Sequence, residues 1–279
     1  MRGLAAALAL LLSVSPSVRP AVGPSVRPPV RQTPRRYIVP YTTRAPAIDG
    51  RLDDPAWAAA PWSDDFVDIE GDAKPAPPLR TRVRMLWDST ALYIAAQLVE
   101  PDLWGTITER DAVIFQDNDF EVFLDPDGDA RTYFELEVNT LGTAWDLFLP
   151  VAYRDGGHAR NEWNITGLRS AVRLAGTLNQ PADRDSGWTV ELAIPIRDLA
   201  TPEVTTGVPR VGDVWRVNFS RVEWDLREEG NGYVKVADPA TGRPRAEHNW
   251  VWSPQGMVDM HQPERWGFVE FGPAPRRRR

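Results

Sequence analysis

Hydrophobic and polar residues alternate in short runs along most of the chain, and Gly, Pro, Asp and Asn separate the runs. A period of two is typical of β-strands that bury one face, and turn residues at this spacing favour an all-β sandwich. The pattern leaves little room for long helices. It predicts strands at residues 37–41, 80–87, 92–99, 119–124, 133–139, 144–149, 170–174, 187–194, 214–222, 233–236, 249–252 and 266–271.

Two short helical segments are predicted between the strands. In the first, residues 54–60, Asp53 or Asp54 can cap the helix and Pro55 suits its first turn. The second is a single turn at residues 195–199. The predicted fold class is therefore an antiparallel β-sandwich, with jelly-roll or immunoglobulin-like layers and one or two short helices.

The clearest hairpin signal lies in residues 117–146. An Asp-Gly pair at positions 127 and 128 separates two alternating runs, and Gly tolerates the positive φ of a tight turn. Each run gathers its large apolar residues on one face. Because successive side chains alternate, the opposite face of the second run carries Tyr133, Glu135, Glu137 and Asn139. Such a face is either a solvated outer wall or a site for a polar ligand.

Composition narrows the classes of function. The chain has 279 residues, 42% of them hydrophobic, and 12 Trp, which suffices for one large β domain or two small ones. A net charge of −7 argues against nucleic acid as a partner. The absence of Cys excludes disulfides, Cys-ligated zinc and thiol catalysis.

The N-terminus has the pattern of an exported protein. Arg2 precedes an apolar run at 4–12 that is too short to span a bilayer, and small residues follow. We expect a signal peptide at 1–23, with a membrane anchor as the alternative. Residues 24–36 form a Pro/Arg-rich linker, residues 37–272 the folded domain and residues 273–279 a basic tail. The expected location is the periplasm, the cell surface or the medium of a bacterium.

Four stretches, in order, resemble family 9 carbohydrate-binding modules. They are IDGRLDDPAW at 48–57, WDSTALYIA at 87–95, DFEVFLD at 119–125 and GWTVELAIP at 187–195, before a Gly-Asp turn at 212–213. Order and spacing agree from about residue 40 to residue 271. The resemblance implies an antiparallel β-sandwich that binds polysaccharide ends or short sugars, often beside a glycoside hydrolase domain. It also implies structural calcium.

The sequence departs from that family at its sugar clamp, where a pair of Trp rings would enclose the sugar. FQDN at 115–118 and MHQP at 260–263 occupy the places where the two Trp are expected. The resemblance therefore supports the fold more strongly than it supports the sugar specificity.

Sugars stack their C–H faces on indole rings, and their hydroxyls need charged or amide partners. Indoles at strand ends or in polar loops, together with the polar face of residues 133–139, are therefore the candidates. Trp250 and Trp252 share a strand face, so that one ring could stack while the other supports it. The alternative for the polar face is a set of exposed ion pairs with Arg82 and Arg84. The predicted carbohydrate-binding residues are Trp104, Glu135, Glu137, Asn139, Trp145, Trp224, Trp250 and Trp252.

The acidic turn is a candidate calcium site. Asp125, Asp127 and Asp129 offer hard oxygen ligands within five residues, and Asp117 belongs to a second oxygen cluster before the same strand. Gly at the fourth position and Leu136 at the twelfth do not fit an EF-hand. We therefore predict a structural Ca²⁺ held by Asp117, Asp125, Asp127 and Asp129. A plain Asp-Gly turn is the alternative, and the three His have no zinc-ligand spacing.

Evidence for catalysis is weak in the sequence. Glu135 and Glu137 could flank a glycosidic bond, but so could any Glu-x-Glu on a strand. No nucleophile elbow, phosphate loop or dinucleotide fingerprint is present. We predict an exported, non-catalytic protein that binds polysaccharide or oligosaccharide and supports carbohydrate catabolism. The alternatives are a surface or structural interaction module that has lost the clamp, and a weakly active glycoside hydrolase accessory.

Overall fold

The computed structural model describes residues 32–204 and 206–274. The predicted signal peptide, the first part of the predicted linker (24–31) and the last five residues of the predicted tail lie outside the described residues. Within those ranges, no helix combines the length and the apolar character needed to cross a membrane.

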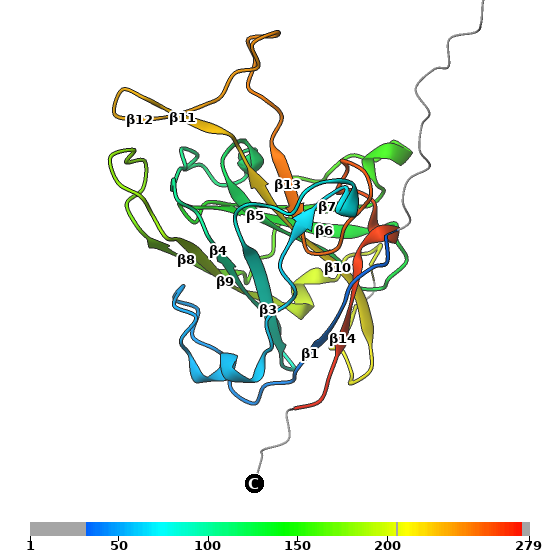
Figure 1. Cartoon of the computed structure of the whole chain (residues 1–279). Coiled ribbons are helices and arrows are strands. Elements are labelled where there is room, and N and C mark those ends of the chain that lie inside the picture. Colours follow the sequence, from blue (N-terminus) through cyan, green and yellow to red (C-terminus); the bar gives the residue numbers. More distant parts are fainter. Residues whose placement is uncertain (1–31, 205, 275–279) are drawn as a thin grey trace, which may run out of the picture. The chain divides into compact units, whose positions relative to one another are not determined.

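Two β-sheets form the domain, as predicted (Figure 1). The larger sheet has the strand order β1 (Arg36–Val39), β14 (Gly267–Phe271), β10 (Val214–Glu223), β5 (Asp119–Asp125), β6 (Tyr133–Asn139) and β7 (Ala144–Leu149). Two further strands extend it, since β13 (His248–Val251) pairs with β10 and β2 (Val67–Asp68) pairs with β13. The smaller sheet has the order β3 (Thr81–Trp87), β4 (Ala91–Leu98), β9 (Gly187–Pro195) and β8 (Arg169–Ala175).

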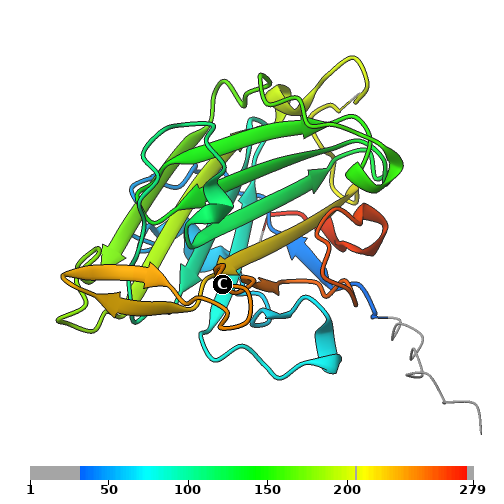
Figure 2. The same ribbon diagram turned by 90° about the horizontal axis from the view of Figure 1, so that it is seen from above.

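The pairings within both sheets are antiparallel, except that β1 runs parallel to β14. A separate hairpin, β11 (Leu226–Glu229) and β12 (Gly232–Lys235), projects from the body of the domain (Figure 2). Short 3-10 helices connect the strands; they are η1 (Pro55–Ala59), η2 (Gly71–Ala73), η3 (Ile114–Gln116), η4 (Tyr153–Asp155), η5 (Ile196–Leu199) and η6 (Pro263–Arg265).

All twelve predicted strands are present, and their ends lie within two residues of the predicted ends. The pattern did not predict β2, which has two residues, or β11, whose sequence LREE has no apolar alternation. Both predicted helical segments form as 3-10 turns. At η1, the Asp54 side chain accepts a hydrogen bond of 2.8 Å from the Ala56 backbone N–H, so Asp54 is the cap.

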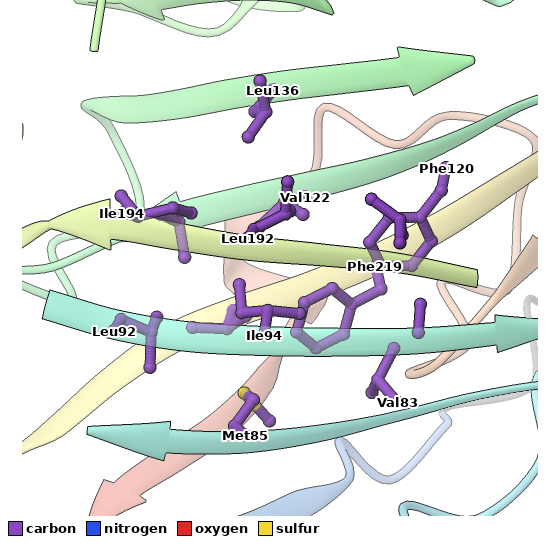
Figure 3. Packing of buried hydrophobic residues seen from close by; sticks show 14 of the residues in the cluster. Val83, Met85, Leu92, Ile94, Phe120, Val122, Leu136, Leu192, Ile194 and Phe219 are labelled. Carbon is purple, nitrogen blue, oxygen red and sulfur yellow. The ribbon is translucent and has the colours of Figure 1, made fainter. Parts of the chain in front are cut away.

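The core lies between the two sheets (Figure 3). Phe120 and Val122 of β5 and Leu136 of β6 pack with residues of the smaller sheet such as Met85 and Ile94. These residues of the larger sheet have even numbers, so their odd-numbered neighbours on β5 and β6 face away from the core. The predicted division of the hairpin into an apolar face and a polar face is confirmed.

A single buried carboxylate joins two of the stretches that carry the family resemblance. Glu191 of β9 accepts hydrogen bonds from the Asp49 and Gly50 backbone N–H groups at 3.0 and 2.8 Å. It also accepts one from Trp57 Nε1 at 2.7 Å. The segment 48–57 is therefore fixed against the outer face of the smaller sheet.

A buried ion network links the two sheets at one end of the core. Arg221 of β10 donates to Glu100 Oε2 at 2.7 Å and lies 2.8 Å from Glu223 Oε2. The same guanidinium donates to Thr81 Oγ1 and to the Val99 carbonyl, both of which belong to the smaller sheet or its continuation. Because Arg221 is only 1% exposed, its charge is balanced by these partners and not by solvent.

Candidate functional site

The outer face of β5, β6 and β7 is covered on one side by chain that returns over the larger sheet. Phe123, Tyr133 and Leu147 point outward and pack with Met260 and Trp266 from that returning segment. We call this set the outer aromatic cluster; its buried members are Ile69, Phe123, Tyr133, Leu147, Leu149, Ala152, Val251, Met260 and Trp266. The cluster covers only part of the face, and the acidic residues of β5 and β6 lie beside it.

A cavity of about 430 Å³ opens next to the outer aromatic cluster. Its floor contains Glu121 of β5 and both Glu135 and Glu137 of β6, and we call it the acidic cavity. Trp145, Tyr153 and His261 contribute rings to its walls, and Phe115 contributes a ring from η3. The lining thus combines carboxylates with aromatic rings, as polar-ligand sites on β-sandwiches commonly do.

Strand register brings the acidic groups together. Glu121 of β5 lies directly opposite Glu137 of β6, and Phe123 lies directly opposite Glu135. Asp119 stands two residues before Glu121 and therefore shares its face. Like charges directly opposite each other on a sheet destabilise it, so this arrangement costs folding free energy unless something compensates.

Burial dominates the protonation of these carboxyls. It raises the pKa of Glu121 to about 7, and it raises the pKa values of Glu135 and Glu137 well above the usual range. Neighbouring carboxylates add to the effect; for Glu137 they are Asp119, Glu121 and Glu135. Glu137 has one favourable contact, because the Phe115 backbone N–H donates to its Oε2 at 2.8 Å.

The acidic cavity contains no basic side chain to balance these groups. Among the described residues that line it there is no Arg or Lys. His261 Nδ1 lies 4.0 Å from Glu135 Oε2, but it is hydrogen-bonded to the Tyr133 hydroxyl at 2.8 Å. Burial lowers the pKa of His261 to about 4, so the imidazole is neutral near pH 7.

Several polar atoms around the cavity floor have no hydrogen-bond partner within the protein. Neither carboxylate oxygen of Asp119 has one, although the residue is fully buried. The Val222 backbone N–H offsets part of the rise in the Asp119 pKa without reaching hydrogen-bonding geometry. Glu135 Oε2 and Trp145 Nε1 are also unpartnered. Buried polar groups are normally satisfied, so this concentration of exceptions points to a ligand.

A larger hollow elsewhere lacks this chemistry. A cavity of about 610 Å³ lies beside Pro195 and Ile196, and its described lining has neither a carboxylate nor an aromatic ring. Volume alone therefore does not select a site, and the acidic cavity is the better candidate.

Three of the predicted carbohydrate-binding residues meet in the acidic cavity: Glu135, Glu137 and Trp145. The other four predicted indoles are not among the residues that line it. Trp104 and Trp224 pack in a small cluster with Val222, and the Lys235 ammonium lies 3.3 Å from the Trp224 ring centroid. The cluster adjoins the cavity only through Val222 and Phe115, which line it.

Trp250 and Trp252, predicted as a stacking pair, lie in the core between the sheets. They are 5% and 1% exposed, and neither indole offers a ring face to a ligand that arrives from solvent. The intervening Val251 faces the opposite way, into the outer aromatic cluster. The prediction that both indoles share one face of the strand is confirmed, but that face points into the core and not toward solvent.

Asn139 and Asp117 have structural partners. The Asn139 side chain donates to Asp117 Oδ2 at 3.0 Å and to the Ile107 carbonyl, and its Oδ1 accepts from backbone N–H groups of its own turn. The Asp117 oxygens also accept from Thr106 and from the Ile107 backbone N–H. Both side chains therefore fix the loop before β5.

The acidic turn gathers three of the four predicted calcium ligands. Asp125, Asp127 and Asp129 each offer an oxygen within 4.8 Å of the others. Asp117 lies before β5, whose seven residues separate it from the turn by about 20 Å or more, so it cannot join them. Asp125 accepts from the Gly128 and Ala130 backbone N–H groups, as expected for an Asp-Gly turn.

Arg82 and Arg84 do not face the polar strand β6, because β3 belongs to the smaller sheet. Their guanidinium groups lie 4.2 and 4.5 Å from the Trp62 ring centroid. The ion pairs between these arginines and Glu135 or Glu137, which were the alternative for the polar face, therefore do not form.

Sequence reasoning missed Glu121, Phe115, Tyr153 and His261. Glu121 could have been found, because it alternates with Phe120 and Val122 in the same way as Glu135 alternates with Phe134. Phe115 and His261 lie within the two stretches where the resemblance places the clamp, and both line the acidic cavity. The resemblance therefore located the two walls although neither carries the expected Trp. The sequence around Tyr153 has no hydrophobic pattern or motif that would have predicted its place in the cavity wall.

Comparisons with known proteins agree with this fold. The model of the family described as carbohydrate family 9 binding domain-like matches residues 48–270. A family 9 carbohydrate-binding module from Caldicellulosiruptor kristjanssonii in complex with cellotriose is 18% identical, with a TM-score of 0.55, over 86% of this chain and 95% of that chain. A candidate carbohydrate-binding protein from Bacteroides uniformis is 15% identical, with a TM-score of 0.59, over 86% of this chain and 100% of that chain.

The Caldicellulosiruptor module in complex with glucose is 17% identical, with a TM-score of 0.54, over 88% of this chain and 99% of that chain. At these identities the solved structures show a common fold. No curated protein matches the chain. The family match covers most of the sequence and confirms the resemblance carried by residues 48–57 and 187–195. The chain therefore belongs to the carbohydrate family 9 binding domain-like family.

Proposed function

We propose that this protein binds carbohydrate non-covalently in the acidic cavity. The observation that carries the proposal is the meeting of Glu121, Glu135 and Glu137 with the ring of Trp145 in one cavity on a family 9 fold. Carboxylates accept hydrogen bonds from sugar hydroxyls, while ring faces pack against sugar C–H groups. The two Caldicellulosiruptor complexes, with cellotriose and with glucose, support this class of ligand.

The unpartnered atoms indicate how a sugar would be held. Glu135 Oε2 can accept from a hydroxyl, and Trp145 Nε1 can donate to one. A volume of about 430 Å³ is in the lower part of the range of small-molecule sites, which suits a short oligosaccharide or a chain end. We expect the ligand to lie between Phe115 on one wall and Tyr153 and His261 on the other.

The proposed role is that of an exported, non-catalytic protein that holds polysaccharide or oligosaccharide near degrading enzymes and so supports carbohydrate catabolism. Export rests on the apolar run at residues 4–12. A non-catalytic role rests on the family.

Calorimetric titration against glucose, cello-oligosaccharides and xylo-oligosaccharides tests the proposal. Trp145→Ala should weaken binding at least about tenfold, because loss of an aromatic contact and its burial costs on the order of 1.4 kcal/mol. Trp224→Ala is the matched control, since this indole lies outside the cavity lining. No heat across the whole panel would overturn the carbohydrate proposal. Release of reducing sugar on prolonged incubation would overturn the non-catalytic one.

A structural Ca²⁺ at the acidic turn is a separate part of the proposal. The residues fit a partly exposed ion, because Asp127 and Asp129 are accessible and each carboxylate oxygen that accepts a backbone N–H has a second lone pair. If the ion binds there, Asp127→Asn should melt at a lower temperature than the wild type in Ca²⁺, whereas the two proteins should melt alike in chelator. Equal melting temperatures of the wild type and Asp127→Asn in Ca²⁺ would leave the turn as a plain Asp-Gly turn.

A further inference from the structure

We propose that Glu121 and Glu137 on the floor of the acidic cavity form a divalent-cation site together with Asp119, which stands beside them on β5 and is not part of the cavity lining. It is distinct from the acidic turn at the other end of β5. It concerns the same cavity as the proposed function, but cation binding there does not require that a sugar binds.

The three side chains already have the geometry of a ligand set. Each offers a carboxylate oxygen, and these oxygens all lie within 4.8 Å of one another. Two neighbouring strands supply them in register, since Glu121 is opposite Glu137 and Asp119 is two residues before Glu121. Oxygens held by a sheet have little freedom to separate, so the site is largely formed before the ion arrives.

Unpartnered buried oxygens are the second observation. Asp119 is 0% exposed, and neither of its carboxylate oxygens accepts a hydrogen bond. Glu135, beside the set and 5% exposed, has an unpartnered Oε2. A buried carboxyl whose oxygens lack hydrogen-bond donors is costly, and a bound cation would supply the missing partner.

Among the described residues, positively charged side chains near the three carboxyls do not balance their negative charge, so a bound cation would have to do so. The described lining has no Arg or Lys, and His261 donates no positive charge near pH 7. The ammonium of Lys235 is engaged over the Trp224 ring outside the cavity. An all-carboxylate set of hard oxygens favours Ca²⁺ over the softer transition metals, which prefer imidazole or thiolate.

Such an ion would face the open side of the cavity. Ca²⁺ takes six to eight oxygen ligands, so three carboxylates leave positions for water or for paired hydroxyls of a sugar. The cation would then join the sugar-binding surface, and sugar affinity would depend on Ca²⁺. This consequence rests on the proposed function, whereas the cation site itself does not.

The test uses the full chain, stripped with chelator and dialysed, in the absence of sugar. Ca²⁺ is titrated calorimetrically. Tb³⁺ luminescence excited through Trp gives a second readout, and Trp145, which lies directly opposite Glu137 on the neighbouring strand, is a suitable donor. Glu121→Gln should weaken the cavity-floor site at least tenfold and remove its Tb³⁺ signal. Asp127→Asn, at the acidic turn, is the matched control and should retain that site and its signal.

A second variant guards against loss of folding. Asp119→Asn keeps the size of the side chain and removes a buried carboxyl that lacks a donor, so we expect its melting temperature in chelator to equal or exceed that of the wild type. It should nevertheless bind Ca²⁺ at least tenfold more weakly. A folded Asp119→Asn protein with undiminished affinity would overturn the proposal.

Three further outcomes test the cation site and its link to sugar binding. Failure of the wild type to bind Ca²⁺ at millimolar concentration would overturn the site, and so would a single site lost in Asp127→Asn but retained in Glu121→Gln. Sugar titrations are then repeated with and without Ca²⁺. Sugar bound equally in chelator would leave the proposed function standing while removing the cation from the sugar-binding surface.

Discussion

The Glu191 carboxylate shows how one residue can hold two distant stretches of sequence together. Residues 48–57 form no strand, and without a partner in the smaller sheet they would be an exposed loop. Three donors converge on Glu191, which is 1% exposed: the backbone N–H groups of Asp49 and Gly50 and the indole Nε1 of Trp57. Hydrogen bonds to a buried charged acceptor are among the stronger ones in proteins.

Glu191→Ala should therefore lower the free energy of unfolding by about 3 kcal/mol, because it leaves buried donors without an acceptor. Glu191→Gln should cost less, since its amide oxygen still accepts from one side. Urea denaturation measures both. Glu229→Ala is the control, because Glu229 is 57% exposed and pairs only with Arg227 on the β11–β12 hairpin. If Glu191→Ala were as mild as Glu229→Ala, the carboxylate would not be the anchor.

At the scale of the element, the alternation of apolar and polar residues was enough to predict the strands and so the fold class. β5, β6 and β7 each turn every second side chain toward the core between the sheets, and this period predicted their bounds almost to the residue. The same period could not say which face of β13 points inward, because each face carries one polar and one apolar residue, His248 with Trp250 and Asn249 with Val251. Trp250 and Trp252 were therefore expected at the surface and lie in the core.

The candidate site was harder to predict from the sequence than the strands were, because it depends on how the strands pair. Glu135 and Glu137 are visible as outward residues of one strand, but the cavity exists only because β5 lies beside β6 in a particular register. Tyr153 and His261 come from segments more than a hundred residues apart that meet over the larger sheet. No local pattern contains that information, and only the family resemblance indicated the two stretches, residues 115–118 and 260–263, that contribute rings to the walls.

The start of β9 depends on a glycine. Gly187 has φ +136°, and a Cβ built on it would lie 2.1 Å from the Leu98 carbonyl oxygen of β4. Gly187→Ala should therefore lower the free energy of unfolding by at least about 2 kcal/mol, through backbone strain and a clash with the neighbouring strand. Gly232→Ala on β12 is the matched control, since its Cβ would meet nothing within 4 Å. Thermal unfolding of both variants checks this, and equal melting temperatures would contradict it.

At the scale of the whole molecule, the two sheets are joined by an ion network as well as by apolar packing. Arg221 belongs to the larger sheet, while Glu100 follows β4 of the smaller one. A buried pair of this kind is weak evidence for net stability, but removing one partner leaves the other charge uncompensated. The network therefore ties the relative position of the sheets to a single guanidinium.

Arg221→Ala should cost about 3–5 kcal/mol, because Glu100 and Glu223 would remain buried without their counter-charge. Arg245→Ala is the control, since its pair with Asp225 is well exposed on both sides and should contribute well under about 1 kcal/mol. Denaturant unfolding compares the two. A similar loss in both variants would show that the network is not structurally important.

The division of β5 to β7 into even-numbered core residues and odd-numbered cavity residues also bears on how this family can diversify. Positions 121, 135, 137 and 145 can change one at a time and alter the chemistry of the cavity lining, while Phe120, Val122 and Leu136 continue to hold the sheets together. Inserting one residue within a strand would exchange the two sets and destroy both. New specificities in this scaffold should therefore arise by substitution within these strands and by length changes only in the turns.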